Sequence, residues 1–127
     1  MSAVLDVFDH VTLRVSSLAR SRRFYELAVG ELGYDAPTRG PEFVEWEDLS
    51  ISAASDERPV TRNLHLALVA SSRDAVDAWW RAMVAAGHPD DGGPAPRPQY
   101  SPGYYGAYAL DPDGHNIEAV FHDRKET

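Results

Sequence analysis

The stretch HVTLRVSSLARSRRFY at residues 10–25 has a counterpart, HLALVASSRDAVDAWW, at residues 65–80. In both, a histidine precedes an alternating apolar run typical of a half-buried strand. A pair of serines follows, and a helical pattern with two adjacent aromatic residues comes next. One offset of 55 residues, from His10 to His65, aligns all of these features. Several features in register at one spacing indicate an internal duplication.

Each half predicts one helix after its strand. The first helix is expected over residues 18–32, with Ser17 as its N-cap and Gly33 as its C-terminal stop. The second is expected over residues 73–86 and ends at Gly87. Both helices therefore have the same sequence pattern: a serine N-cap, an amphipathic body and a terminal glycine.

Strand-like runs return after each helix, at residues 43–47, 49–54, 104–110 and 116–121. Between the second helix and its strands lies PDDGGPAPRPQYSPG, residues 89–103, whose prolines and glycines favour an ordered but irregular loop. Loops of this length are uncommon unless they cover a site or link elements.

Each half is therefore a βαβββ-type module, at about residues 6–56 and about 61–123 of a single domain spanning 1–127. In such a module the helix covers one face of the sheet, so two modules must pair to bury the rest. We expect an α+β fold made of two paired βαβββ modules.

Composition limits the classes of partner. The net charge is −8 and the pI is near 4.9, which disfavours phosphate backbones and anionic lipid surfaces. The absence of cysteine excludes disulfides, thiolate metal ligands and a cysteine nucleophile. The start of the sequence lacks the pattern of a secretion signal, and no apolar run approaches membrane-spanning length. We expect a cytoplasmic protein with a small-molecule substrate, and neither a nucleic acid nor a membrane as partner.

Three expected strands each place one potential metal ligand on the face opposite the helix: His10, His65 and Glu118. Two imidazoles and one carboxylate form the facial set that binds a divalent ion and leaves coordination positions open. Iron, manganese, zinc or nickel would suit Lewis-acid or oxygen-activating chemistry at such a site. In the alternative interpretation the histidines are hydrogen-bonded strand-end residues, and Glu118 faces solvent or bridges to Arg14.

The duplication also indicates that the first module lacks a carboxylate ligand. Aligning ISAA, residues 51–54, with IEAV, residues 117–120, places Ser52 where Glu118 lies. A symmetric site would have two histidines and two carboxylates, so we expect three protein ligands. A register shift would bring Glu45 or Glu47 into consideration instead.

Two further side chains are candidates for the chemistry. Arg14 shares the face of His10 and is expected to bind an anionic substrate or to form a structural ion pair. If Leu110 pairs with His115 across the DPDG turn, Tyr105 shares the face of the acidic residue in the last strand. A one-residue bulge would exchange it for Tyr104 and Tyr108.

Three stretches resemble the vicinal oxygen chelate superfamily, which includes glyoxalase I, bleomycin-resistance proteins and extradiol dioxygenases. They are DHVTLRVSSLARSRRFYELAVGELGY at 9–34, HLALVASSRDAVDAWWRAMVAAG at 65–87 and GYYGAYALDPDGHNIEAVFH at 103–122. The resemblance implies a half-open, cup-shaped barrel sheet with the helices outside and a divalent metal within. It assigns the metal ligands to His10, His65 and Glu118. It also implies a homodimer, in which the two modules either close one cup within a chain or share cups between the two copies.

The resemblance also ranks the functions. Glyoxalase I has a fourth ligand in its first module, and Ser52 in this chain argues against that enzyme. Extradiol dioxygenases use the His, His, Glu set found here, whereas bleomycin-resistance binders lack it. The resemblance therefore implies a metal-dependent dioxygenase or a lyase/isomerase acting on a small substrate with vicinal oxygens. The alternative is a metal-free binding or drug-resistance protein that uses the same cup.

Overall fold

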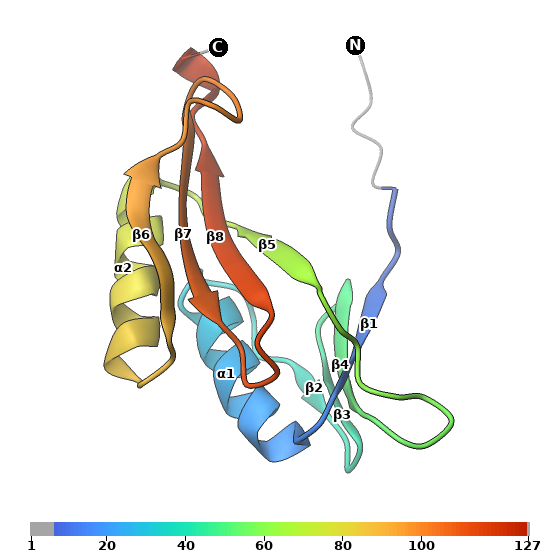
Figure 1. Ribbon diagram of the computed structural model, residues 1–127. Coiled ribbons are helices and arrows are strands. Elements are labelled where there is room, and N and C mark those ends of the chain that lie inside the picture. Colours follow the sequence, from blue (N-terminus) through green and yellow to red (C-terminus); the bar gives the residue numbers. More distant parts are fainter. Residues whose placement is uncertain (1–6, 127) are drawn as a thin grey trace.

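The computed structural model describes residues 7–126. Its elements form two successive modules of identical order, strand–helix–three strands (Figure 1). The first consists of β1 (Val11–Val15), α1 (Leu18–Gly30), β2 (Thr38–Arg39), β3 (Phe43–Glu45) and β4 (Leu49–Ala53). The second consists of β5 (His65–Val69), α2 (Arg73–Ala85), β6 (Asp90–Pro96), β7 (Tyr104–Leu110) and β8 (Asn116–His122), followed by a 3-10 turn at Arg124–Glu126.

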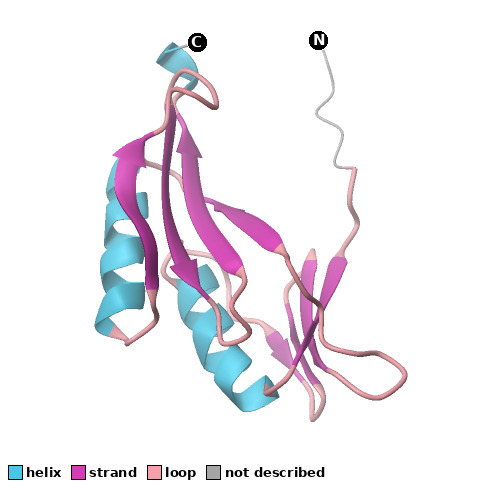
Figure 2. Ribbon diagram, in the orientation of Figure 1, coloured by secondary structure: helices cyan, strands magenta, loops and turns pink. Residues whose placement is uncertain are grey.

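Each module forms its own four-stranded mixed sheet, with strand order β1-β4-β3-β2 in the first and β5-β8-β7-β6 in the second. The first strand of each module pairs in parallel with the last, and the other pairings are antiparallel. Figure 2 shows that the two sheets stay separate and do not close into one barrel. This architecture confirms the predicted α+β fold of paired βαβββ modules with a half-open cup.

The apolar faces of both modules meet in one core around the helices. Phe24 and Tyr25 of α1 and Trp79 of α2 are fully buried, together with Leu13 and Ile117 from the two sheets. The Trp79 Nε1 group donates a hydrogen bond of 2.9 Å to the Ala28 carbonyl oxygen and so links the two helices. Three of the four aromatic residues that revealed the duplication therefore lie in the shared core, whereas Trp80 donates to Asp90 of its own module.

The predicted helix signals are confirmed to within two residues. Ser17 and Ser72 are the N-caps, and each side chain accepts a hydrogen bond from a backbone N–H in the first turn. Gly33 and Gly87 follow the helix ends with φ of 88° and 94°, a conformation that glycine adopts at little cost. No helix among the described residues has the length and apolar character needed to cross a membrane.

The expectation of an irregular loop over residues 89–103 is wrong in its first half, which is strand β6. The strand tolerates Pro94 and Pro96 because it lies at the sheet edge, where a missing N–H costs no ladder hydrogen bond. Its pairing with β7 slips twice, around Gly92 and before Ala95. Bulges of this kind hide a strand from a search for strict alternation.

The β7–β8 turn decides which side chains face the cup. The Asp111 N–H donates to the His115 carbonyl oxygen at 3.0 Å, so Leu110 pairs with Asn116. Of the two alternatives, the structure therefore has the one-residue bulge, and Leu110 does not pair with His115. Gly114, with φ of 83°, supplies the additional residue, because a type I turn followed by a left-handed residue makes a three-residue loop.

Candidate functional site

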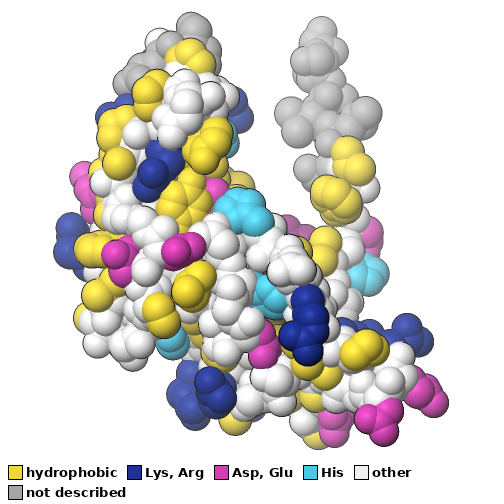
Figure 3. Space-filling view, in the orientation of Figure 1, with side chains coloured by type: hydrophobic (Ala, Val, Ile, Leu, Met, Phe, Trp, Pro, Cys, Tyr) yellow, Lys and Arg dark blue, Asp and Glu magenta, His cyan; other side chains and the backbone are white. Residues whose placement is uncertain are grey.

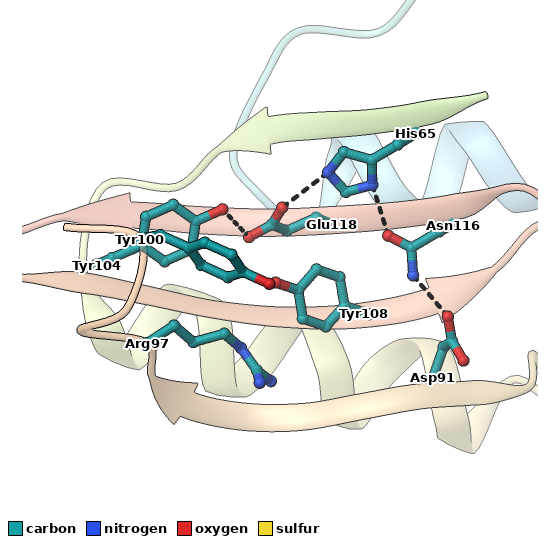
Figure 4. A pocket seen from close by; sticks show the side chains of 8 residues that line it. All are labelled: His65, Asp91, Arg97, Tyr100, Tyr104, Tyr108, Asn116 and Glu118. Carbon is teal, nitrogen blue, oxygen red and sulfur yellow. Dashed lines mark hydrogen bonds and ion pairs between the residues drawn. The ribbon is translucent and has the colours of Figure 1, made fainter.

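A cavity of about 580 Å³ opens on the β5–β8 sheet, on the face turned away from α2 (Figure 4). Its volume lies within the usual range for small-molecule sites. The strands, together with the loop after β6, supply its lining: His65, Asp91, Arg97, Tyr100, Tyr104, Tyr108, Asn116 and Glu118. Every lining residue belongs to the second module.

Glu118 is fully buried at the centre of β8. Its Oε2 atom accepts a hydrogen bond of 2.5 Å from the Tyr104 hydroxyl, and its Oε1 atom lies 3.1 Å from Nε2 of His65. Burial and the hydrogen bond to Glu118 both raise the pKa of Tyr104, so this hydroxyl remains a proton donor. A buried carboxylate needs such partners, and one tyrosine and one histidine side chain supply them.

A chain of hydrogen bonds fixes the orientation of His65. Asn116 Nδ2 donates to Asp91 Oδ2 at 2.6 Å, and Asn116 Oδ1 lies 2.5 Å from His65 Nδ1 (Figure 4). Because a carboxylate only accepts, the Asn116 amide must turn its oxygen towards His65. Nδ1 of His65 therefore carries the proton that it donates to this oxygen.

The proton on Nδ1 determines the role of the other ring nitrogen of His65, Nε2. In neutral His65 the Nε2 lone pair points at the Glu118 carboxylate, and two acceptors 3.1 Å apart repel each other. A proton between the two groups, carried by the imidazole or by the carboxyl group, resolves this conflict, and so does a metal cation held by both. Metal-binding histidines commonly have their other nitrogen fixed in this way, so His65 and Glu118 offer two of the ligands that a divalent ion needs.

Gly106 of β7 leaves the space that the Glu118 carboxylate occupies. A Cβ atom at this position would lie 2.5 Å from Glu118 Oε2 and 3.3 Å from Cε1 of Tyr104. The absence of a side chain therefore allows β7 to pass directly across the carboxylate.

The structure brings together only two of the three predicted metal ligands. His65 and Glu118 meet in the cavity, whereas His10 precedes β1, outside the cavity lining. The His10 side chain is 61% exposed, and its Nδ1 atom lies 2.6 Å from Asp9 Oδ1. Within residues 7–126, no three acidic or histidine side chains gather closely enough to hold a metal ion.

Tyr105 lies on the opposite face of β7 from the cavity. Its hydroxyl donates to Asp77 of α2 at 2.6 Å, and the Arg73 guanidinium lies 5.1 Å from its ring centre. The one-residue shift at the turn exchanges it for Tyr104 and Tyr108, which was the bulged alternative. We therefore correct the placement of Tyr105 on the face of the site.

Arg14 does not reach the cavity. Its backbone pairs with Thr61, and its side chain forms no ion pair with Glu118, whose Oε1 atom instead lies beside His65. The strand registers also correct the position equivalent to Glu118. Thr12, two residues after His10, lies opposite Ser50, whereas Ala67, two residues after His65, lies opposite Glu118. Ser50, and not Ser52, is thus the first-module counterpart of Glu118.

Sequence reasoning missed four lining residues: Asp91, Arg97, Tyr100 and Asn116. The first three come from the segment expected to be a loop. Asn116 had an available signal, because it shares the strand parity of Glu118 and stands two residues before it.

Comparison with known proteins identifies the family. The model of the Glyoxalase/Bleomycin resistance protein/Dioxygenase superfamily matches residues 7–119, and the chain belongs to this superfamily. No curated protein matches the chain.

Solved structures agree with this assignment. A glyoxalase/bleomycin resistance protein from Albidiferax ferrireducens is 27% identical with a TM-score of 0.71, over 91% of this chain and 99% of its own. A glyoxalase-related enzyme from Fulvimarina pelagi is 25% identical with a TM-score of 0.70, over 92% and 88% of the two chains. A lactoylglutathione lyase from Agrobacterium tumefaciens, at 19% identity and a TM-score of 0.66 over 93% and 95%, shares the fold.

Proposed function

We propose that the protein is a divalent-metal-dependent enzyme, dioxygenase-like or lyase/isomerase-like, that acts on a small substrate with vicinal oxygens. The observation that carries this proposal is the Nε2 lone pair of His65, which the hydrogen bonds of Asn116 and Asp91 direct at the buried Glu118 carboxylate. Ser50 at the counterpart of Glu118 argues against a glyoxalase I with four protein ligands.

His65, Glu118 and His10 would hold the metal, which supplies Lewis-acid stabilisation of negative charge on a chelating substrate or activation of dioxygen. Two tyrosines of the cavity would assist the metal. Tyr104 keeps its hydroxyl proton and directs it towards Glu118 or a substrate oxygen nearby. Tyr108 lies beside it, and its pKa is also raised by burial and by Glu118.

We further propose that His10 comes from a second copy of the chain, because it lies outside the cavity of its own chain. Val7 and Phe8, just before it, are 84% and 73% exposed. Figure 3 shows hydrophobic side chains on this segment standing clear of the rest of the molecule, and Figure 1 shows the segment leading away from both sheets. Burying them on another copy would remove apolar surface from water, as is typical of homodimer interfaces.

The test is metal content combined with mixing of variants. Wild-type protein should bind about one metal ion per chain, and His10→Ala and Glu118→Ala should each lose it. Unfolding and refolding the two variants together should restore roughly a quarter of the wild-type metal, because half of the dimers are mixed and each holds one complete site. A monomer, or a mixture that restores nothing, would contradict the shared site. Wild-type protein that takes up no metal after reconstitution would contradict the metal enzyme.

A metal-free binding protein is the second candidate. It is supported by the same His65–Glu118 pair, which a protonated imidazole also satisfies within hydrogen-bond distance. This function predicts ligand binding that is unaffected by a chelator and by His10→Ala.

A further inference from the structure

Arg97 lies just after β6 and carries the cationic group of the cavity wall. Its guanidinium carbon lies 4.7 Å from the ring centre of Tyr108, and its Nη2 atom donates to the Gly93 carbonyl oxygen at 2.9 Å. Its Nε atom is buried without a hydrogen-bond partner, and the side chain forms no ion pair with any residue from 7 to 126. A guanidinium has five N–H donors, so most of its binding capacity is unused.

The carboxylates of the cavity, by contrast, have partners already. Asp91 accepts from Asn116, and Glu118 is held by Tyr104 and His65. Among the lining residues Arg97 is the only lysine or arginine. Hydrogen bonds from Asn116 and Tyr104 satisfy these two carboxylates without cancelling their charges, so the permanent positive charge of this wall is confined to the Arg97 guanidinium, which has N–H donors left for an anion.

Tyr108 lies between Arg97 and the proposed metal ligands. Its ring centre is 4.7 Å from the Arg97 guanidinium carbon on one side and 6.3 Å from the His65 ring centre on the other. The Tyr100 and Tyr104 rings, 5.1 Å apart, continue the aromatic wall, and Figure 4 shows the three tyrosines side by side above Arg97. One tyrosine ring thus separates a metal-ligating end from an anion-binding end.

We infer that the substrate carries a carboxylate, that Arg97 binds this group, and that a flat body rests on the tyrosines. Arginine matches the planar geometry of a carboxylate with paired hydrogen bonds. The inference deepens the proposed function and rests on it for the vicinal-oxygen end alone. Arg97 is accordingly a specificity-determining residue, whereas His65 and Glu118 act on the oxygens at the other end.

The experiment compares two probes that differ by one group, catechol and 3,4-dihydroxybenzoate. Their affinities are measured by calorimetry for wild-type protein, with metal and after chelator treatment, and for Arg97→Met, Arg97→Lys and Arg81→Met. Arg81 is an exposed arginine of α2 and controls for the loss of one charge. Thermal unfolding of each variant checks that it folds.

Wild-type protein should bind 3,4-dihydroxybenzoate about ten-fold or more tightly than catechol, the effect of one charge-assisted hydrogen bond. Arg97→Met should remove this preference and leave the affinity for catechol unchanged, Arg97→Lys should retain part of it, and Arg81→Met should retain all of it. Equal affinities in the wild type, failure of both probes to bind, or a preference that survives Arg97→Met would overturn the inference. If the affinity for catechol is the same with metal and after chelator treatment, while the preference that depends on Arg97 remains, the proposed function is refuted and the inference stands.

Discussion

The contact between Gly106 and Glu118 gives the sharpest quantitative prediction. In Gly106→Ala the new methyl group would lie 2.5 Å from Glu118 Oε2, well inside van der Waals contact. The carboxylate must then move away by roughly 1 Å, because carbon and oxygen atoms are ordinarily separated by 3.4 Å or more. That movement breaks the 2.5 Å hydrogen bond from the Tyr104 hydroxyl.

The magnitude follows from two opposed effects. A hydrogen bond to a charged group contributes about 1.5–3 kcal/mol to the free energy of unfolding. Replacing a strand glycine by alanine returns about 0.5–1 kcal/mol, because alanine loses less backbone entropy on folding. We expect a net loss of about 1–2 kcal/mol in Gly106→Ala, together with weaker metal binding.

A double-mutant cycle, measured by urea unfolding, tests whether the contact with Glu118 causes the loss of stability in Gly106→Ala. The four proteins are wild type, Gly106→Ala, Glu118→Ala and the double variant. Without the Glu118 carboxylate the methyl group has space, so Gly106→Ala should become neutral or slightly stabilising in that background. The reasoning would be refuted by a Gly106→Ala cost that is the same with and without the carboxylate.

Two other side-chain changes test the hydrogen-bond networks. Asn116→Leu should lower metal affinity by about ten- to a hundred-fold in a competition with a fluorescent chelator, because His65 loses the partner that fixes its tautomer; unchanged affinity would sink that role. Tyr25, whose hydroxyl donates to Asp111, has a pKa raised above its ordinary value of 10.0 chiefly by burial. Its contribution to stability is therefore complete below pH 10 and is lost as the pH rises further. The free energy of unfolding should fall above about pH 10, and Tyr25→Phe should flatten that decline; identical slopes would contradict it.

The fold could be predicted from the sequence because the duplication repeats short motifs, each of which reflects local structure. The histidine, the serine pair and the aromatic pair recur at one spacing, and each reflects a nearby interaction such as Ser17 or Ser72 capping its helix. Strand parity then placed His65 and Glu118 on one face, where they meet at 3.1 Å. These predictions depend on short-range geometry, which a sequence encodes directly.

Register was harder to predict. The single left-handed residue Gly114 shifts β7 by one position against β8, and this moves Tyr105 to the helix face and Tyr104 to the cavity. Such a shift reverses every side chain of a strand, although it changes only one turn residue. Similarly, the bulges of β6 hid the strand that carries Asp91 into the cavity.

The place of His10 depends on the arrangement of whole modules. Its strand parity was predictable, but the position of one sheet relative to the other depends on how the helices pack around Trp79. No local pattern in the chain specifies whether the first module faces its own second module or another copy.

The prolines of β6 also limit how copies of this chain can associate. Pro94 and Pro96 remove N–H donors from one margin of the second sheet, and β2, with two residues, offers little at the corresponding margin of the first. Among the described edge strands, β5 keeps a margin free of proline, whereas the margin of β1 is partly occupied because the Arg14 backbone pairs with Thr61. Copies that join along the β5 margin leave little further template for strand addition. Self-association should therefore stop at a closed pair even in concentrated solution, and fibrous growth is disfavoured.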